Sequence, residues 1–463
     1  MKSKWGKRIG YGIGDLGCNL VFSTMSSYLL IFYTDVFGIA AAAAGTMMLV
    51  TKLIDAITDT IMGVIVDKTH TKWGQGRPYF VVGAVPFAVF TVLTFIVPDL
   101  SEGGKLVWAY VTYCLLCTAY TVVNIPLNTI VPRLSADPNE RNILVTTRMV
   151  CALLGTAIVM SITTPFVKLV GGIVDPGIAD PFKSPKAWIV VMGVYGVAAM
   201  LIFFLTFAST EEVVPPSVQN ESSALKDNIK AMTGQAWLVM IFNFLYFALY
   251  VVRSTTVIYF FKYNLQREDL ATLVGFLGIL SGLPMLLCLP KLESKYGKRN
   301  ILFLSIAIYL AGNALILINQ TSVAFQLAGL VITGLGIYGV FGTVFAMQPD
   351  AIDYSEWKKN RSISGTIAAF QGLFVKASMG LASWIIGLYL GMNGYDGAAS
   401  AQGPAAQQSI QFCYMWIPVI LCVLLAITNI FWKLDSCADE MRAELDARRK
   451  KLQELHQMAD CHF

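Results

Sequence analysis

Long apolar runs separated by short polar breaks constrain the fold of this 463-residue chain more than any other feature. A transmembrane helix needs about 20 consecutive apolar residues, and within lipid only helices and closed barrels pair all their backbone polar groups. We expect about twelve transmembrane helices, over residues 9–33, 40–66, 78–98, 105–132, 143–170, 186–208, 235–263, 269–290, 300–319, 322–349, 362–392 and 408–433. The expected fold class is an all-α integral membrane protein.

Composition excludes the main soluble classes of protein. Hydrophobic residues make up 56% of the chain and charged residues 14%, where a soluble protein carries about 25% charged residues. Cys114 and Cys117 lie inside an apolar run, which favours small helix residues over a zinc or redox pair. No phosphate-binding GxxxxGK[ST] loop or nucleophile elbow occurs, and a net charge of +5 does not imply nucleic acid. We expect a protein that is not an enzyme and has no cofactor, and nothing implies an obligate protein partner.

A polar linker divides the twelve runs into two sets of six. The predicted parts are an N-terminal six-helix bundle over 1–208, a central cytoplasmic loop over 209–234, a C-terminal six-helix bundle over 235–434 and a cytoplasmic tail over 435–463. A basic loop motif recurs, since Gly74 and Gly297 lie 223 residues apart and Arg141 and Arg361 lie 220 apart. These offsets favour a duplicated six-helix unit. The alternative is that all cytoplasmic loops are simply basic.

Basic residues gather in alternate loops. The N-terminus, the tail and the breaks after every second run carry most of the lysines and arginines, and the other breaks carry few. The positive-inside rule then predicts that both termini are cytoplasmic. The expected location is the plasma membrane, which is the inner membrane in a Gram-negative bacterium.

Three charged residues fall within the second predicted span, where each costs about 2.5–3.5 kcal/mol to insert. Lys52, Asp55 and Asp59 recur at spacings of three and four, so they share one helical face. Two carboxylates one turn apart can coordinate Na⁺ or share a proton. Further oxygens on this helix could come from Thr51, Thr58 and Thr60. Without a nucleotide-driven motor, this pattern predicts a secondary transporter, with a purely structural charge network as the alternative.

Three more charges lie within other spans. Lys376 in the eleventh run is the expected counter-charge to Asp55 and Asp59 from the opposite half of the chain. Arg148, at the start of the fifth run, suits a substrate carboxylate or a pair of hydroxyls. Arg253 in the seventh run fits an internal brace and a substrate contact equally well.

Polar side chains repeat at helical spacing in two further spans. The stripes are Asp15, Asn19 and Ser23 in the first run and Tyr120, Asn124 and Asn128 in the fourth. Amides both donate and accept hydrogen bonds, which suits sugar hydroxyls, and a tyrosine ring offers a stacking face. Polar contact between helices is the alternative. Asp15, near one end of its run, is interpreted as a cap or loop tether, with a functional role as the alternative.

Several motifs together resemble one family of transporters. They are YGIGDLGCNL, YLLIFYTDVFGI, LVTKLIDAITDTIMGVIVDKTHTKWGQGRP, YTVVNIPLNTIVP, DAIDYSEW and FVKASMG. In order and spacing, over essentially the whole chain, they resemble the glycoside–pentoside–hexuronide:cation symporters. That family has the major facilitator fold and includes melibiose permease and the glucuronide carriers. The resemblance implies two pseudo-symmetric six-helix bundles that work by alternating access.

The resemblance also implies roles for individual residues. Asp55 and Asp59 match the cation-site carboxylates, and they are the expected metal ligands if the ion is Na⁺. Lys376 matches the coupling lysine, and Lys52 falls where a basic residue is expected. The candidate substrate-binding residues are Asn19, Tyr120, Asn124, Asn128, Arg148, Phe341 and Gln371.

Some positions depart from the family pattern. Asn19 and Asn124 are aspartates in melibiose permease, and Asn128 and Phe341 are tryptophans there. The usual KFRP ending of the first basic loop is QGRP here, residues 75–78. The asparagines resemble the glucuronide-carrier pattern.

These observations predict symport of a monovalent cation, Na⁺ or H⁺, with a sugar glycoside. An acidic, hexuronide-type glycoside is favoured, because two acids, Asp55 and Asp59, face three bases in the predicted cavity. Lys52, Arg148 and Lys376 then leave one excess positive charge, which an anionic substrate would relieve. A neutral pentoside or β-glycoside is the alternative. A sodium-coupled lysolipid carrier, a membrane-embedded enzyme and a sensor without transport are more remote.

Overall fold

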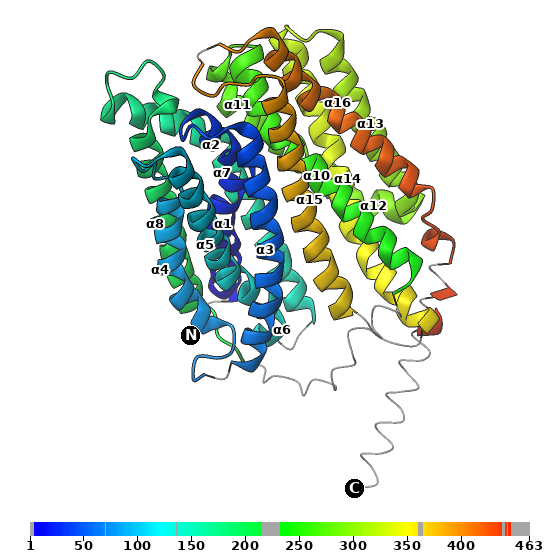
Figure 1. Ribbon diagram of the computed structural model, residues 1–463. Coiled ribbons are helices and arrows are strands. Elements are labelled where there is room, and N and C mark those ends of the chain that lie inside the picture. The colour runs from blue at the N-terminus through cyan, green and yellow to red at the C-terminus, as the bar shows by residue number, and fades with distance from the viewer. Residues whose placement is uncertain are drawn as a thin grey trace, which may run out of the picture. The chain divides into compact units, whose positions relative to one another are not determined.

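The computed structural model describes residues 4–69, 71–135, 138–213, 232–359, 364–399, 401–437, 440–441 and 443–445, and within them it is helical without a β-strand (Figure 1). The helices are α1 (Lys4–Ser27), α2 (Leu29–Asp35), α3 (Ala41–Lys68), α4 (Arg77–Thr94), α5 (Glu102–Thr129), α6 (Val131–Leu134), α7 (Pro138–Val174), α8 (Pro185–Ser209), α10 (Gly234–Tyr259), α11 (Ala271–Leu280), α12 (Leu283–Tyr296), α13 (Lys298–Ile318), α14 (Val323–Lys359), α15 (Ser364–Met392) and α16 (Pro404–Asn429). Short helical turns are η1 (Pro181–Lys183), η2 (Phe260–Asn264), η3 (Glu268–Leu270) and η4 (Leu434–Ser436).

The helices account for the predicted spans, with differences in how they break. Ten described helical segments are long and apolar enough to cross a membrane, or eleven if α1 and α2, bent by 49°, form one span. The 28-residue α3, which contains Lys52, Asp55 and Asp59, is not among these segments. Counting it as a span gives about twelve in total. The predicted run 269–290 is divided into α11 and α12 near Gly282, because Pro284 has no N–H to donate and its ring would clash with the carbonyl of Leu280, where α11 ends. Helix α14 continues past the predicted end at 349 to Lys359. The prediction followed the apolar run, and the last turns of the helix are polar.

Contacts group the chain into two compact units. Unit 1 contains Met1–Val218, Tyr250–Ile279 and Lys376–Pro418, and unit 2 contains Gln219–Leu249, Leu280–Val375 and Val419–Phe463. Lys376 therefore belongs to the same unit as α3, although it comes from the second half of the sequence. The predicted domain boundaries stay predictions, since most of the loop 209–234 and most of the tail 435–463 lie outside the described residues.

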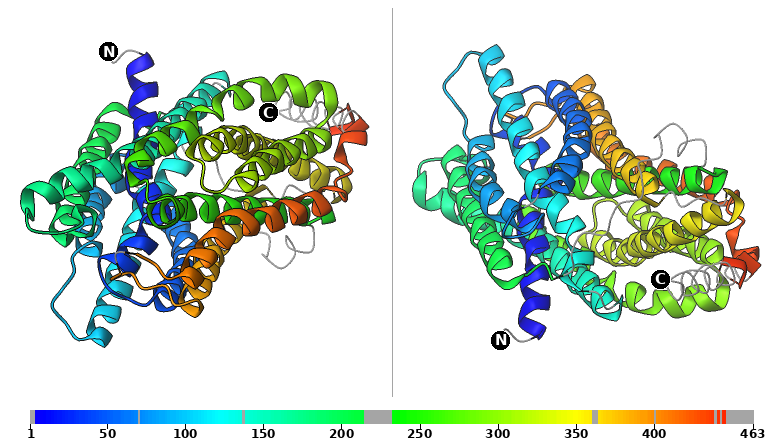
Figure 2. Two further views of the ribbon diagram at one scale, coloured as in Figure 1. Left: turned by 90° about the horizontal axis from the view of Figure 1, so that it is seen from above. Right: turned by 90° about the horizontal axis from the view of Figure 1, so that it is seen from below.

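Unit 1 is built from lengthwise helix pairs. Helix α1 packs against α7 and α8, α4 packs against α5 and α8, and α3 packs against α5 (Figures 1 and 2). The α1–α7 pair is close because Gly155 has no side chain: a Cβ there would lie 2.9 Å from the Leu16 carbonyl oxygen and 3.0 Å from Asn19 Cβ. This approach places the polar stripe of α1 beside α7.

Helix α15 contributes a second close contact within unit 1, against α3. A Cβ on Gly387 would lie 2.4 Å from the Ala41 carbonyl oxygen, and one on Gly380 would lie 3.0 Å from Lys52 Cβ. The two helices therefore meet through backbone and small residues, which we call the α3–α15 contact (Ala41, Gly45, Gly380 and Gly387). It brings Lys376 to the charged face of α3.

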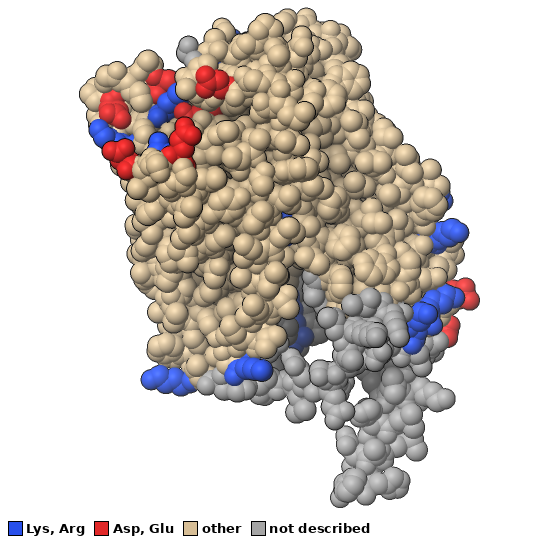
Figure 3. Space-filling model, viewed as in Figure 1, with Lys and Arg blue, Asp and Glu red and all other residues tan. Residues whose placement is uncertain are grey.

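The outer surface of the helices is apolar, as a bilayer requires. Ile57 on α3, Leu169 on α7 and Leu201 on α8 all have exposed side chains. Figure 3 shows acidic and basic side chains gathered around the loop that joins α7 to α8, whereas the helices below that loop present none to the viewer. These long apolar helices make the protein a multi-pass membrane protein.

The start of α4 carries a carboxylate cap from a distant residue. The backbone N–H groups of Gln75, Gly76 and Arg77 donate to the Glu212 carboxylate over 3.0, 2.9 and 3.2 Å. Arg77 also donates from Nη2 to the Phe207 carbonyl oxygen at 2.9 Å. These bonds pair N–H groups that a helix start otherwise leaves unpaired, and they anchor residues 75–77 to the end of α8 and the segment after it.

The start of α13 in unit 2 carries the same cap. The Arg299 N–H donates to Asp435 at 2.8 Å, and Arg299 Nη2 donates to the Ile430 carbonyl oxygen at 3.0 Å. Asp435 follows Glu212 by 223 residues, the offset that separates the two loop motifs. The two halves therefore repeat a tertiary contact as well as a sequence pattern, which supports the duplicated, pseudo-symmetric architecture.

Candidate functional site

Helix α3 presents Lys52, Asp55 and Asp59 on one face, as their spacing predicts. The Asp55 side chain is 1% exposed, and the Asp59 side chain is 22% exposed. A buried carboxylate is stable as an anion only when charges or hydrogen bonds compensate it. The surroundings of this pair therefore decide what it can do.

Lys376 on α15 bridges the two carboxylates. Its Nζ lies 2.8 Å from Asp55 Oδ2 and 2.6 Å from Asp59 Oδ2, and it donates to the Asp55 carbonyl oxygen at 3.1 Å. Lys52 is a second, more distant base, with Nζ 3.7 Å from Asp55 Oδ2. The Lys52 ammonium also lies over the rings of Phe22 and Tyr113, at 5.7 and 5.8 Å. The two acids and two bases balance in charge. Because Lys376 is the closer base, it is the main neutralising group of the two carboxylates.

Thr121 on α5 contacts both carboxylates. Together with Lys52, Asp55, Asp59 and Lys376 it forms what we call the α3 carboxylate cluster. The Thr121 hydroxyl donates to Asp55 Oδ1 at 3.1 Å or to Asp59 Oδ1 at 2.7 Å. A hydroxyl has one proton, so it serves one carboxylate at a time and keeps a lone pair for a further partner. Sequence analysis missed Thr121; the signal was its position directly after Tyr120 on a predicted cavity-lining span.

The threonines expected from α3 itself do not join the cluster. Thr58 and Thr60 donate to carbonyl oxygens of their own helix, on Asp55 and Ala56, and the Thr51 hydroxyl contacts Cys114 Sγ at 3.7 Å. Such bonds to the preceding turn are the ordinary fate of threonine in a helix. In the part of the chain that the structure describes, no group of three or more His, Cys, Asp or Glu residues is placed to hold a metal.

Arg148 on α7 is paired with Asp15 on α1. Arg148 Nε lies 3.1 Å from Asp15 Oδ2, and Arg148 Nη1 donates to the Tyr11 hydroxyl at 3.4 Å. Tyr11 in turn donates to the Leu127 carbonyl oxygen at 2.8 Å. The interpretation of Asp15 as a cap or loop tether is wrong, because it lies within α1 and its carboxylate faces a neighbouring helix.

A row of hydrogen bonds continues from Asp15 along α1. Asn19 Nδ2 donates to the Asp15 carbonyl oxygen at 2.8 Å and to Asp15 Oδ1 at 3.3 Å. Thr156 donates to Asn19 Oδ1 at 3.4 Å, and its hydroxyl lies 3.0 Å from the Ser23 hydroxyl. Asn19 is thus held beside Arg148 by partners on both sides.

The α5 stripe lies near this row. The Tyr120 ring stacks on Phe22 with centroids 5.5 Å apart, and Cys18 Sγ lies 3.9 Å from Asn124 Oδ1. Asn128 is exposed and donates to the Asn124 carbonyl oxygen at 2.9 Å. Tyr120 is therefore already stacked, while the side-chain NH₂ of Asn124 has no acceptor among the described residues.

Two predicted substrate residues belong to unit 2. The Phe341 ring packs against Tyr246 at 5.4 Å, and Gln371 Nε2 donates to Asn243 Oδ1 at 3.0 Å. Arg253, in unit 1, stacks on the Tyr414 ring at 4.2 Å and donates to its carbonyl oxygen at 3.4 Å. Of its two predicted roles, these contacts favour the internal brace.

A second buried acid, Asp35 at the end of α2, has a different environment. Asp35 Oδ2 lies 3.1 Å from Lys262 Nζ and accepts from the Tyr263 hydroxyl. Asp35 Oδ1 accepts from Thr34 at 2.8 Å and from Tyr395 at 2.5 Å. This Asp35 cluster (Thr34, Asp35, Lys262, Tyr263 and Tyr395) joins the first half of the chain to η2 and to the segment after α15.

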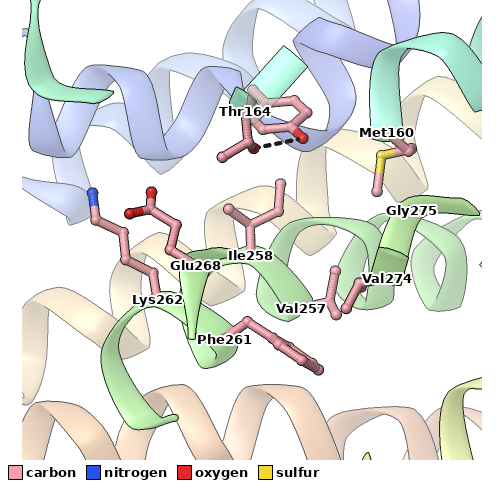
Figure 4. A pocket seen from close by; sticks show the side chains of 10 residues that line it. Met160, Thr164, Val257, Ile258, Phe261, Lys262, Glu268, Val274 and Gly275 are labelled. Atoms are coloured by element: carbon pink, nitrogen blue, oxygen red, sulfur yellow. Dashed lines mark hydrogen bonds between the residues drawn. The ribbon is translucent and has the colours of Figure 1, made fainter. Parts of the chain in front are cut away.

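A small, mostly apolar cavity lies beside the Asp35 cluster. Lys262 and Glu268 mark its polar side, and Met160, Ile258 and Phe261 contribute apolar walls (Figure 4). Glu268 is paired with Lys168 at 2.6 Å, so its charge is already compensated. None of the predicted substrate residues lines this cavity, and it is distinct from the substrate region.

Comparison with known proteins agrees with this architecture. The sequence model of the family described as "MFS/sugar transport protein" matches residues 10–436. The isoprimeverose transporter of Lactiplantibacillus pentosus is 36% identical over 448 residues, which cover 96% of this chain and 92% of that one. The putative glycoside/cation symporter YagG of Escherichia coli K12 is 31% identical, over 92% of this chain and 91% of that one.

The solved structures agree at the level of the fold. A bacterial homologue of the human lysosomal transporter Spinster, inward-facing and unoccupied, matches with a TM-score of 0.65 at 12% identity, over 92% of this chain and 95% of that one. The predicted all-α major facilitator fold with about twelve transmembrane helices is confirmed, and the protein is a transporter rather than an enzyme. The chain belongs to the MFS/sugar transport family, the glycoside–pentoside–hexuronide group that its motifs resemble.

Proposed function

We propose that this protein is a symporter that couples a monovalent cation, Na⁺ or H⁺, to uptake of a sugar glycoside by alternating access. The observation that carries the proposal is the Asp55–Asp59 pair, which a single ammonium, that of Lys376, bridges within unit 1. Family membership supports the sugar and glycoside class of substrate.

The cluster supplies a coupling mechanism through competition. Lys376 and a bound cation use the same carboxylate oxygens of Asp55 and Asp59. With a cation bound and both lysines in place, the cluster would carry an excess charge of about +1 at membrane depth, which is costly. Cation binding therefore favours withdrawal of Lys376, and α15 with it, from α3. The ammonium that leaves becomes free to donate to a substrate.

The charge balance favours an uncharged glycoside over an acidic one. The predicted positive excess counted Arg148 as unpaired, but Asp15 lies 3.1 Å from it. With Asp15 included, Asp55 and Asp59 balance Lys52 and Lys376, so before a cation binds the site has no excess positive charge for an anionic substrate to neutralise. Isoprimeverose, the sugar in the name of one relative, is a disaccharide without a carboxylate.

We place both termini on the cytoplasmic side, as the basic loops indicate. The charges of the first basic loop support this orientation, since Lys72 and Arg77 lie at the same end of α3 and α4 as the N-terminus of α1 (Figure 1). Impermeant thiol labelling of a single cysteine at Lys72 should succeed only from the cytoplasmic side.

Uptake by purified protein in liposomes tests the function. We expect tritiated isoprimeverose to accumulate above the external level when a Na⁺ or a proton gradient is imposed, and only to equilibrate without a gradient. A panel of neutral and acidic glycosides then ranks the substrates by competition. If neither the Na⁺ nor the proton gradient changes uptake, coupling is contradicted. If no glycoside is transported, the substrate class is contradicted.

A further inference from the structure

The Asp15–Arg148 pair has a geometry that bears on which substrates are accepted. The Asp15 carboxylate reaches the Nε edge of the guanidinium, and its side chain is 14% exposed. Its other oxygen accepts from Asn19 Nδ2, a predicted substrate residue. Asp15 is thus fixed between Arg148 and Asn19, two residues predicted from the sequence to bind the substrate.

Arg148 keeps donors for a neutral partner. A guanidinium has five N–H donors, and here Nε faces Asp15 while Nη1 donates weakly to Tyr11 at 3.4 Å. The Arg148 side chain is 20% exposed, so its remaining N–H groups can donate to sugar hydroxyls.

A carboxylated sugar meets two obstacles at the same place. Along the Nε edge, where arginine offers two parallel bonds to a carboxylate, the sugar carboxylate would compete with Asp15, whose Oδ2 lies 3.1 Å from Nε. It would also lie within a few ångströms of the Asp15 charge, and like charges at about 4–6 Å repel strongly in a partly buried site.

We infer that Asp15 is a specificity-determining residue, which neutralises Arg148 and thereby restricts the transporter to uncharged glycosides. This inference rests on the proposed function, glycoside symport, and on the predicted place of Arg148 in the substrate site. Asp15 acts through Arg148 rather than by touching the substrate, so it is a positioning residue.

The test is Asp15→Asn, which keeps the size and the hydrogen bonding of the side chain but removes its charge. Methyl β-glucoside and methyl β-glucuronide compete against labelled isoprimeverose in liposomes containing wild type or variant. The ratio of the two inhibition constants should move toward the glucuronide by about tenfold, since hydrogen bonds to charged groups are worth about 1.5–3 kcal/mol. An unchanged ratio, or wild type that already prefers the glucuronide, overturns the inference.

Two further variants separate specificity from structure. Asp269→Asn removes a carboxylate that pairs with Arg267 at 2.9 Å on an exposed turn, and it should leave the ratio at the wild-type value. If Asp15→Asn does not fold, Asp15→Ser also removes the charge, and the same ratio of inhibition constants is measured on it. If the role of Asp15 is purely structural, the variant binds the neutral and the acidic glycoside equally less well, and the ratio of their inhibition constants does not change. Absence of any glycoside transport by wild type refutes the proposed function instead.

Discussion

Unit 1 holds two buried clusters in which a carboxylate meets a lysine from the second half of the sequence, and they differ in their other donors. Asp35 accepts from Lys262 and from hydroxyls of Thr34, Tyr263 and Tyr395. Among the described residues, Asp55 and Asp59 accept from one hydroxyl, that of Thr121, and their other charged partners are lysines.

We expect this difference to separate a structural ion pair from the proposed cation-binding site. A carboxylate that accepts from several fixed hydroxyls stays compensated whatever its lysine does, because hydrogen bonds to the charged form stabilise it. A pair of carboxylates neutralised chiefly by one ammonium has acceptors that a cation can take over. Burial and charge pairing are common to both clusters, so the count of neutral donors distinguishes them.

The largest expected effect comes from Asp59→Asn. Removing this charge should abolish uphill accumulation while leaving some facilitated exchange, since the cluster then lacks the second carboxylate that holds the cation. Gradient-driven uptake and counterflow in liposomes measure the two activities separately. Accumulation near the wild-type level in the variant would show that the cation is held elsewhere.

Lys376→Gln should be rescued by removing one acid. The single variant leaves two close carboxylates with only Lys52 nearby, and loss of one partner of a buried pair costs about 3–5 kcal/mol. The double variant with Asp59→Asn should regain part of the lost melting temperature. Additive losses in that double-mutant cycle would contradict direct coupling of the two residues.

Thr121→Val tests the lone hydroxyl donor. The valine keeps the shape but removes the bonds to Asp55 and Asp59, so the cation concentration for half-maximal uptake should rise about tenfold. Thr121→Ser retains the hydroxyl and should stay close to wild type. Equal behaviour of the valine and serine variants would remove Thr121 from the cluster.

Asp35→Asn should show the opposite profile from Asp59→Asn. We expect a stability loss of about 1.5–3 kcal/mol, because charged hydrogen bonds become neutral ones, while the gradient response persists. Melting temperature and accumulation ratio, measured on the same preparation, check both parts. Loss of uphill transport with an unchanged melting temperature would reverse the assignment of the two clusters.

The smallest effect concerns a pair at the end of the bundle, Arg8 and Glu140. Arg8 donates to Glu140 at 2.8 and 2.6 Å, and this hydrogen bonding lowers the pKa of Glu140. The folded pKa is below the unfolded one, so the stabilisation is present above about pH 4.5 and is lost as pH falls through the folded value. Glu140→Gln should lower the melting temperature slightly at pH 7 and by less at pH 3. An equal difference at both pH values would exclude this linkage.

Sequence patterns predicted what depends on spacing along one helix. The face of α3 that holds Asp55 and Asp59 follows from helical periodicity, and the number of spans follows from apolar runs. Contacts between helices were harder: Thr121 reaches the carboxylates from α5, and Asp15 meets Arg148 across α1 and α7. Both contacts depend on how one helix is rotated against its neighbour. Close approaches at glycines such as Gly155 set that rotation, and they leave no periodic pattern in a single sequence.

The α3–α15 contact has a consequence for the speed of the transport cycle. Because small residues such as Gly380 and Gly387 form it, its closest approaches are between backbone and Cβ atoms, and we expect few side chains to change rotamer when one helix shifts. Steric friction along this surface is low, and the ion pairs of Lys376 are the main attachment to be broken at each turnover. The timing of the cycle is then set by electrostatics rather than by repacking, so the slow step should respond to the cation and little to the bulk of neighbouring side chains.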